Sequence, residues 1–229
     1  MTAKILIFLF SGLFLFSYGQ KKKKKHVDLL AEYHSFKDGE LRKDFSPTPL
    51  NKRIAAFPFS KATKVKIISY NLNLKRSTAN SYVPPPPPSK TKEDSIRLAK
   101  YYDSIKKNTK FELREAIEQS IFAGIQESRT LTLSEISELT DVIYNTCDKY
   151  YFKSVSSSGC FFPRNAILFY DEDDKIFAYF EICFECSGIE SSPRNILDPF
   201  KTCEYLYPDL QKFFKSKGLT TEYEEKKIV

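Results

Sequence analysis

Two apolar stretches joined by an acidic turn dominate the hydropathy pattern of the carboxy-terminal half of the chain. Residues 160–186 read CFFPRNAILFYDEDDKIFAYFEICFEC, with β-branched and aromatic residues on both sides of the polar run 171–174. Short apolar runs bounded by turn residues are typical of strands, so a β-hairpin is predicted over 162–184. Residues 64–73 alternate apolar and polar side chains and predict a further strand.

A capping box marks the start of one helix. Thr132 is followed three residues later by Glu135, so each side chain can satisfy a backbone amide at the helix start. Apolar residues then recur at helical spacing, and a helix is predicted over 132–146. The preceding stretch, 111–126, fits either a helix or a strand. Its apolar residues recur every fourth position, but Gly124 also suits the approach to a strand.

A second helix is predicted over 199–217. Asp198 suits the N-cap and Pro199 suits the first turn. An apolar stripe follows, which Pro208 must interrupt by a kink or a restart. Together the elements predict an α+β fold, in which a small, mainly antiparallel sheet with a central β-hairpin packs on two or three helices.

The amino-terminal residues predict export. Residues 1–19 combine Lys4, an apolar run and small residues before Gln20, which is the plan of a signal peptide cleaved after Gly19. The apolar run is shorter than the roughly 20 residues of a membrane-spanning helix, so no permanent membrane span is expected. An uncleaved anchor is the alternative. The mature protein is predicted to be periplasmic or extracellular, where disulfides persist.

One domain with extensions is expected after the leader. Residues 20–62 are interpreted as a basic arm and an extended segment, 63–218 as a single α+β domain, and 219–229 as a charged tail. A proline-rich insertion over 76–110 is expected to loop out, because the five-proline run 84–88 forms a stiff polyproline II spacer. A docking ligand for a proline-binding domain is the alternative interpretation of that run.

Most of the net positive charge lies in the amino-terminal arm. The net charge is +7; Lys4 leaves with the leader and Lys21–Lys25 carries five more charges, so one unit remains for the rest of the chain. A solvated arm is the interpretation, with phosphate or an anionic membrane surface as alternative contacts. No nucleic-acid role is predicted.

The candidate chemistry lies in five cysteines. An odd number allows two bridges and one remaining thiol. The structural interpretation pairs Cys147 with Cys160 and Cys183 with Cys186, while a bridge from Cys160 to either member of the CxxC pair stays open. Cys203 lies on the apolar stripe of the second helix and is the expected remaining thiol, acting as a small hydrophobic residue.

Two further interpretations of the thiols stay open. The CxxC pair, Cys183 and Cys186, suits thiol redox exchange together with Cys160, although no helix follows directly to lower a thiol pKa. Alternatively, these three cysteines and Cys147 supply four sulfurs to a zinc ion, for which a single CxxC is weak evidence. No cofactor is expected under the first interpretation.

A charged pair is predicted within the hairpin. If residues 171 and 174 face each other across the turn, Arg164 lies opposite Glu181. An ion pair that fixes the strand register would make burial of both groups tolerable. An arginine that binds an anionic ligand is the alternative. No histidine lies in the predicted core to serve a Ser or Cys nucleophile, so no catalytic residues are predicted.

The hairpin motif resembles a group of uncharacterised secreted bacterial proteins. The shared pattern is Cys160, then Pro-Arg-Asn-Ala-Ile at 163–167, then Glu-Ile-Cys-Phe-Glu-Cys at 181–186. It covers the hairpin well and the capped helix loosely, and it implies an envelope location but no reaction. The predicted function is a secreted or periplasmic, non-enzymatic module stabilised by disulfides. Its expected partner is an unknown envelope protein or small ligand, and a thiol redox or zinc site is the alternative function.

Overall fold

The structure of the chain is a computed structural model. The predicted signal peptide, most of the basic arm, most of the five-proline run and the predicted helix start at 199 lie outside the described residues. The described ranges are 39–76, 85–86, 91–151, 160–194, 196 and 202–225.

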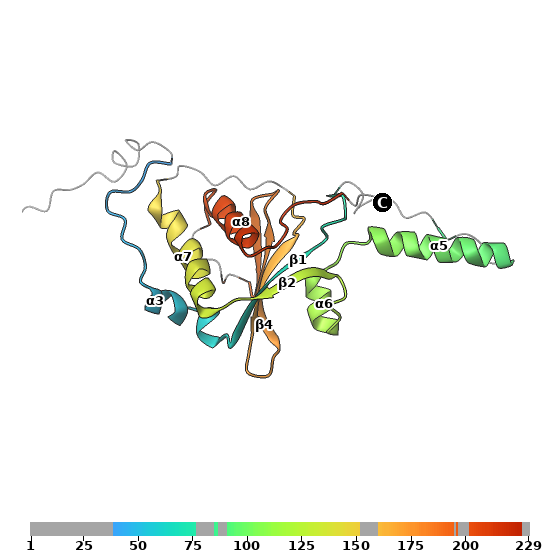
Figure 1. The fold of residues 1–229 in the computed structure, drawn as a ribbon, viewed down its shortest axis with the longest axis horizontal. Coiled ribbons are helices and arrows are strands. Elements are labelled where there is room, and N and C mark those ends of the chain that lie inside the picture. Colours follow the sequence, from blue (N-terminus) through green and yellow to red (C-terminus); the bar gives the residue numbers. More distant parts are fainter. Residues whose placement is uncertain are drawn as a thin grey trace, which may run out of the picture. The chain divides into compact units, whose positions relative to one another are not determined.

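A five-stranded antiparallel sheet organises the chain, in the order β2-β1-β3-β4-β5 (Figure 1). The predicted α+β class is confirmed. The predicted hairpin forms β3 and β4, and the further predicted strand forms β1, so the three inner strands are the three that the sequence marks. The bounds are β1 (Lys64–Tyr70), β2 (Ile125–Thr130), β3 (Asn165–Tyr170), β4 (Ile176–Cys183) and β5 (Gly188–Ser192).

Five α-helices lie in the described part of the chain. The predicted capping box starts α7, where the Glu135 amide donates to Thr132 Oγ1 at 3.3 Å. In return the Thr132 amide donates to the Glu135 carboxylate at 2.9 Å. The bounds are α3 (Leu50–Ala55), α5 (Lys92–Asn108), α6 (Leu113–Gln119), α7 (Leu133–Lys149) and α8 (Leu206–Ser216), with a short 3₁₀ helix, η1 (Phe59–Lys61).

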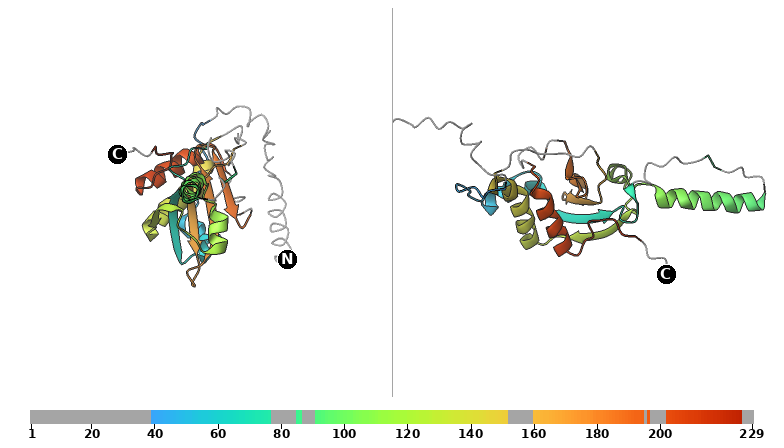
Figure 2. Two further views of the ribbon diagram at one scale, coloured as in Figure 1. Left: turned by 90° about the vertical axis from the view of Figure 1, so that its right-hand side faces the viewer. Right: turned by 90° about the horizontal axis from the view of Figure 1, so that it is seen from above.

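Helices cover both faces of the sheet, with α7 and α8 on one face and α6 on the other (Figure 2). Side chains of successive strand residues point to opposite faces. In β1, Ile67 therefore packs with Leu139 of α7, while Ile68 packs with Leu113 of α6. Burial on both faces explains why β1 and β3 contain consecutive apolar residues instead of a strict alternation.

The sequence pattern predicts neither edge strand of the sheet. The ambiguous stretch 111–126 divides into α6 and the start of β2, with Ser120 in a left-handed conformation (φ 57°) at the end of the helix. Gly124 lets the chain pass against the Phe111 ring, which a Cβ atom would meet. The stretch 187–196 is predicted as loop but contains β5, because pairing with β4 satisfies backbone groups that the local pattern does not reveal.

The second predicted helix is shorter than expected. Residues 202–205 precede it as irregular chain and turn, and α8 begins at Leu206. Pro208 then falls in the first turn, where backbone amides have no intrahelical partner. The helix thus begins two residues before Pro208, and residues 202–205 before it are not helical.

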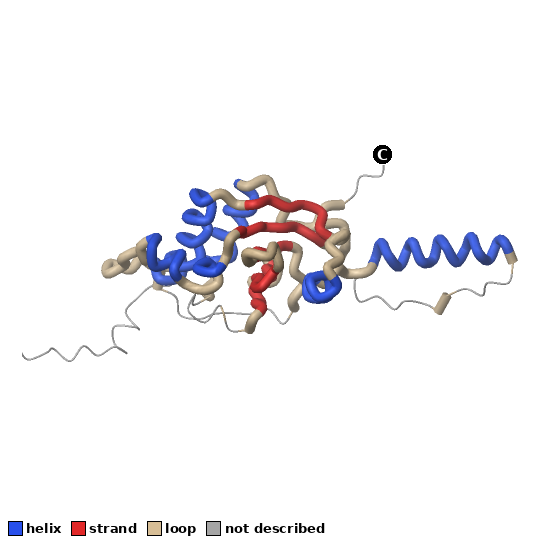
Figure 3. Tube along the Cα trace, turned by 90° about the horizontal axis from the view of Figure 1, so that it is seen from below, coloured by secondary structure: helices blue, strands red, loops and turns tan. Residues whose placement is uncertain are grey.

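The segment after α8, drawn as loop in Figure 3, packs against the sheet. Leu219 and Thr221 are buried, and the Thr220 carbonyl accepts hydrogen bonds from Ser69 and Asn165, each at 2.9 Å. The Glu224 amide donates to the Leu72 carbonyl at 2.8 Å. Residues 219–225, interpreted from the sequence as part of a charged tail, therefore belong to the folded unit.

Candidate functional site

A disulfide joins Cys147, in the last turn of α7, to Cys203, just before α8. Their Cα atoms lie 5.6 Å apart, within the range that disulfides require. The predicted pairing of Cys147 with Cys160 is therefore wrong, and so is the assignment of Cys203 as the remaining thiol. Cys203 is fully buried among apolar residues, as expected. It belongs to the same core cluster as Cys147 of α7.

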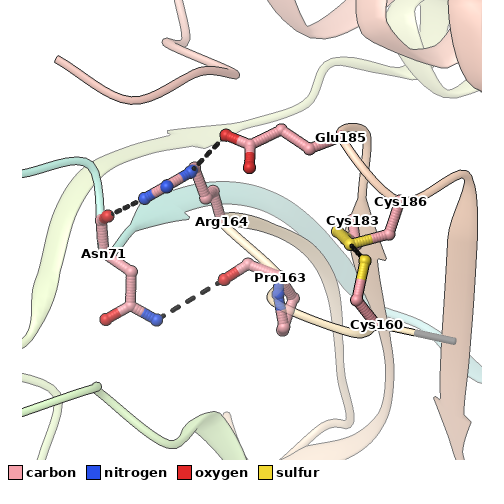
Figure 4. The surroundings of a disulfide bond; sticks show 7 residues. All are labelled: Asn71, Cys160, Pro163, Arg164, Cys183, Glu185 and Cys186. Carbon is pink, nitrogen blue, oxygen red and sulfur yellow. Dashed lines mark hydrogen bonds and ion pairs between the residues drawn. A yellow bond between two sulfur atoms is a disulfide. The ribbon is translucent and has the colours of Figure 1, made fainter. Parts of the chain in front are cut away.

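The other three cysteines meet where β4 turns into β5 (Figure 4). Cys183 ends β4 and forms a disulfide with Cys186 in the following turn, with a Cα separation of 5.2 Å. The sulfur of Cys160 lies 3.0 Å from the sulfur of Cys186. Cys183 and Cys186 are buried, whereas Cys160 is partly exposed. The structure thus brings together three of the four cysteines proposed as a site and places Cys147 elsewhere, in a bond to Cys203.

The hairpin register differs from the predicted one by two residues. Glu181 lies opposite Ala166, not Arg164. The turn is one residue longer than assumed, because the Asp171 amide donates to the Lys175 carbonyl and the Asp171 side chain accepts from the Lys175 amide. A bulge beside Tyr170 shifts the register by the second residue. A shift of two keeps every side chain on its face of the sheet but changes its partner.

Arg164 is buried and forms an ion pair with Glu185, not with Glu181 (Figure 4). Its Nε lies 3.0 Å from the Glu185 carboxylate, and its Nη1 donates to the carbonyls of Asn71 and Leu74. The guanidinium carbon also lies 4.9 Å from the Phe162 ring centroid. These groups belong to segments far apart in sequence, so Arg164 joins the end of β1, the start of β3 and the turn after β4.

Glu181 has a different partner on the α6 face of the sheet. The Tyr70 hydroxyl donates to the Glu181 carboxylate at 2.7 Å. Burial raises the pKa of Glu181, and the Tyr70 hydrogen bond opposes that increase only in part. Burial also raises the pKa of Tyr70 well above its usual value. Burial therefore favours the protonated form of Glu181, whereas the hydrogen bond from Tyr70 favours the carboxylate and is outweighed.

Asn71 is a site residue that the sequence analysis missed. It adopts a left-handed backbone conformation (φ 56°) directly after β1. Its side chain accepts from the Phe111 amide at 2.8 Å and donates to the Phe111 carbonyl at 3.1 Å, while its own carbonyl accepts from Arg164. Asparagine tolerates a positive φ better than most residues. An asparagine directly after a predicted strand was therefore the local signal for this turn.

The zinc interpretation needs four sulfurs in one place, and the bond of Cys147 to Cys203 prevents that set from assembling. Within the residues that the structure describes, no group of three or more His, Cys, Asp or Glu side chains is placed to hold a metal ion. Across the same ranges, none of the helices combines the length and apolar character required to cross a bilayer.

No protein-family profile, no curated protein and no solved structure matches the chain. Function is therefore inferred from the sulfur sites and their surroundings.

Proposed function

We propose that the protein is an exported, non-enzymatic binding module whose fold is stabilised by disulfides. The observation that carries the proposal is the bond between Cys147 and Cys203. It closes 56 residues of sequence and links the end of α7 to the start of α8 within the core. Structural disulfides of this kind persist in oxidising compartments and are rare in the cytosol. The predicted signal peptide is consistent with such a compartment.

The contacts of Arg164 support a structural role for that residue. Its guanidinium is occupied by the Glu185 carboxylate and two backbone carbonyls, and only 3% of the residue is exposed. Binding an anionic ligand there would require replacing these contacts and leaving buried acceptors unsatisfied. The ion-pair interpretation of Arg164 is therefore preferred, with Glu185 as the acid, and the binding role is assigned to another, unidentified surface.

The proposal is tested by expressing the whole chain with its leader in a bacterium. The expected product is found in the periplasm or medium, begins at Gln20 and contains the Cys147–Cys203 bond, which peptide mapping without reductant detects. A matched variant, Gly19→Arg, removes the small residue required for cleavage and should stay unprocessed. A cytoplasmic, unprocessed wild-type protein with both cysteines reduced would overturn the proposal.

A further inference from the structure

Three cysteines share one disulfide at the end of β4. Cys183 and Cys186 form the bond, and the Cys160 sulfur lies 3.0 Å from the Cys186 sulfur. Three sulfurs can hold only one bond among themselves at a time. Exchange proceeds by attack of a thiolate on one sulfur of a disulfide, so the approach of Cys160 to Cys186 places an attacking group beside the atom to be attacked.

Burial distinguishes the three sulfurs. Cys183 is 1% exposed and Cys186 is 2% exposed, so a thiol of another protein cannot reach their bond. Cys160 is partly exposed. A bond between Cys160 and Cys186 would therefore present one reachable sulfur to a partner, whereas the bond between Cys183 and Cys186 presents none.

The Arg164–Glu185 ion pair keeps the sulfurs together. Glu185 directly precedes Cys186 in the turn, and Arg164 lies four residues after Cys160, at the start of β3. The 3.0 Å contact between the two charged groups thus fastens the chain that carries Cys160 to the turn that carries Cys186. The Arg164 side chain is buried, while the Glu185 side chain is 34% exposed, so the contact is protected from water on the arginine side only.

We propose that Cys160, Cys183 and Cys186 form a thiol–disulfide exchange centre that acts on dithiols of other exported proteins. Cys160 is the sulfur that contacts the partner, and Cys186 is the sulfur shared by both internal bonds. Arg164 is a positioning residue. This activity would replace the non-enzymatic part of the proposed function and leave export and the stabilising Cys147–Cys203 bond in place, since a stabilising disulfide needs no third sulfur beside it.

The first step is internal and changes no overall oxidation state. The Cys160 thiolate attacks the Cys186 sulfur, a bond between these two forms, and the bond from Cys186 to Cys183 breaks. The electron pair of the broken bond goes to Cys183, which takes up the proton that Cys160 gave up. The disulfide has then moved from a buried to a partly exposed position.

The later steps transfer two electrons from the partner. One partner thiolate attacks the Cys160 sulfur, forming a mixed disulfide and releasing Cys186 as a thiolate. The second partner thiolate attacks the partner sulfur of that mixed disulfide and releases Cys160. The partner dithiol is now a disulfide, and its two protons pass to the released Cys160 and Cys186 thiolates. Cys183 already carries the proton from Cys160, so all three cysteines end as thiols. The reverse sequence lets a partner disulfide reoxidise the centre.

The test uses oxidised glutathione as the probe and the whole mature chain. Mild reductant first opens the Cys183–Cys186 bond, and mass spectrometry confirms that the Cys147–Cys203 bond remains. Oxidised glutathione is then added, and glutathione adducts are followed by quenching with an alkylating agent and peptide mapping. The wild type is expected to form a transient adduct on Cys160 that disappears as an internal disulfide forms.

Two matched variants separate the roles of the CxxC cysteines. In Cys186→Ser the adduct on Cys160 should persist at least about tenfold longer than in the wild type, because the resolving sulfur is missing. In Cys183→Ser the adduct should clear at a rate similar to that of the wild type and leave a Cys160–Cys186 bond. Equal persistence in both variants, or no adduct on Cys160, overturns the proposal.

A second measurement covers the case in which a variant does not fold. Non-reducing maps of the wild type, quenched at increasing pH, should contain a minor Cys160–Cys186 form that the variant Cys160→Ser lacks. Its absence from the wild type at every pH also overturns the exchange proposal. The module function is unaffected by that result, since it depends on export and on the Cys147–Cys203 bond.

Discussion

The two groups of cysteines in this protein differ in sequence separation and in the number of sulfurs that meet. Cys147 and Cys203 are 56 residues apart in sequence and join the last turn of α7 to the chain just before α8, inside the core. Cys183 and Cys186 are three residues apart, belong to one turn and have Cys160 in contact with them. The first group is a closed pair, and the second is a cluster with one more sulfur than its bond needs.

The difference in sequence separation indicates that the two disulfides contribute differently to the stability of the fold. In the chain-entropy account, a disulfide stabilises by restricting the unfolded chain, and the effect increases with the number of residues enclosed. The Cys147–Cys203 bond encloses a long segment and the Cys183–Cys186 bond a very short one. Stabilisation accounts for the first bond, whereas the second has a small entropic effect and a neighbouring sulfur, which is the basis of the proposed exchange.

The largest expected effect comes from removing the long-range bond. The double variant Cys147→Ala, Cys203→Ala should lose about 4 kcal/mol of unfolding free energy, from the entropy of a loop of this length. Urea unfolding of the oxidised protein measures it. The matched double variant Cys183→Ala, Cys186→Ala should lose roughly 2 kcal/mol or less by the same entropic argument. Equal losses would remove the distinction between the two groups.

Arg164→Met tests what holds the cluster together. The substitution leaves two buried carbonyls and the Glu185 carboxylate without their donor, which should cost about 3 kcal/mol. It should also reduce formation of the Cys160–Cys186 bond while leaving the Cys147–Cys203 bond intact, as peptide mapping can determine. Arg114→Met is the control, because Arg114 forms an exposed ion pair on α6 that should contribute no more than about 0.5 kcal/mol.

Thr132→Ala tests the helix that carries Cys147. Loss of the cap should lower the unfolding free energy by about 1 kcal/mol, because the Glu135 amide loses its acceptor. Thr91→Ala removes an equivalent capping box from α5, and most of the α5 side chains that the structure describes are exposed. Urea unfolding should report a smaller change for Thr91→Ala; a similar change in both would mean that α5 contributes to the core as much as α7.

The smallest effect is a difference in pH dependence between the two regions. Burial raises the pKa of Glu181, on the strand that carries Cys183, above the ordinary 4.5. Its contribution to stability is therefore full below pH 4.5 and is lost as the pH rises through the higher folded-state value. The Thr132 amide lowers the pKa of Glu135, on α7. That contribution is present above pH 4.5 and is lost as the pH falls through the lower folded-state value.

Single substitutions separate the two titrations. Glu181→Gln should remove the decline in stability with rising pH, and Glu135→Gln should remove the loss on acidification, as measured by thermal unfolding from pH 3 to 8. A Glu181→Gln variant with an unchanged pH profile would contradict burial as the cause of the shift.

Features set by neighbouring residues could be predicted from the sequence. The capping box of Thr132 and Glu135 fixes the start of α7 because both partners lie within one turn. The apolar runs around the acidic turn give β3 and β4, because their side chains fit a strand covered on both faces. The edge strands could not be predicted, since the half-exposed β5 depends on hydrogen bonds from β4 and not on its own composition.

The tertiary structure decided which distant residues pair with each other. One extra residue in the turn and a bulge beside Tyr170 shift the hairpin by two positions, so Arg164 meets Glu185 instead of Glu181. The partner of Cys147 depends on how α8 packs against α7, which local periodicity does not encode. The sequence by itself determined the capped helix α7 and the inner strands β1, β3 and β4, because these follow from short-range backbone and side-chain preferences. Only the tertiary structure decided which sulfurs and charges meet, because that depends on packing between distant segments.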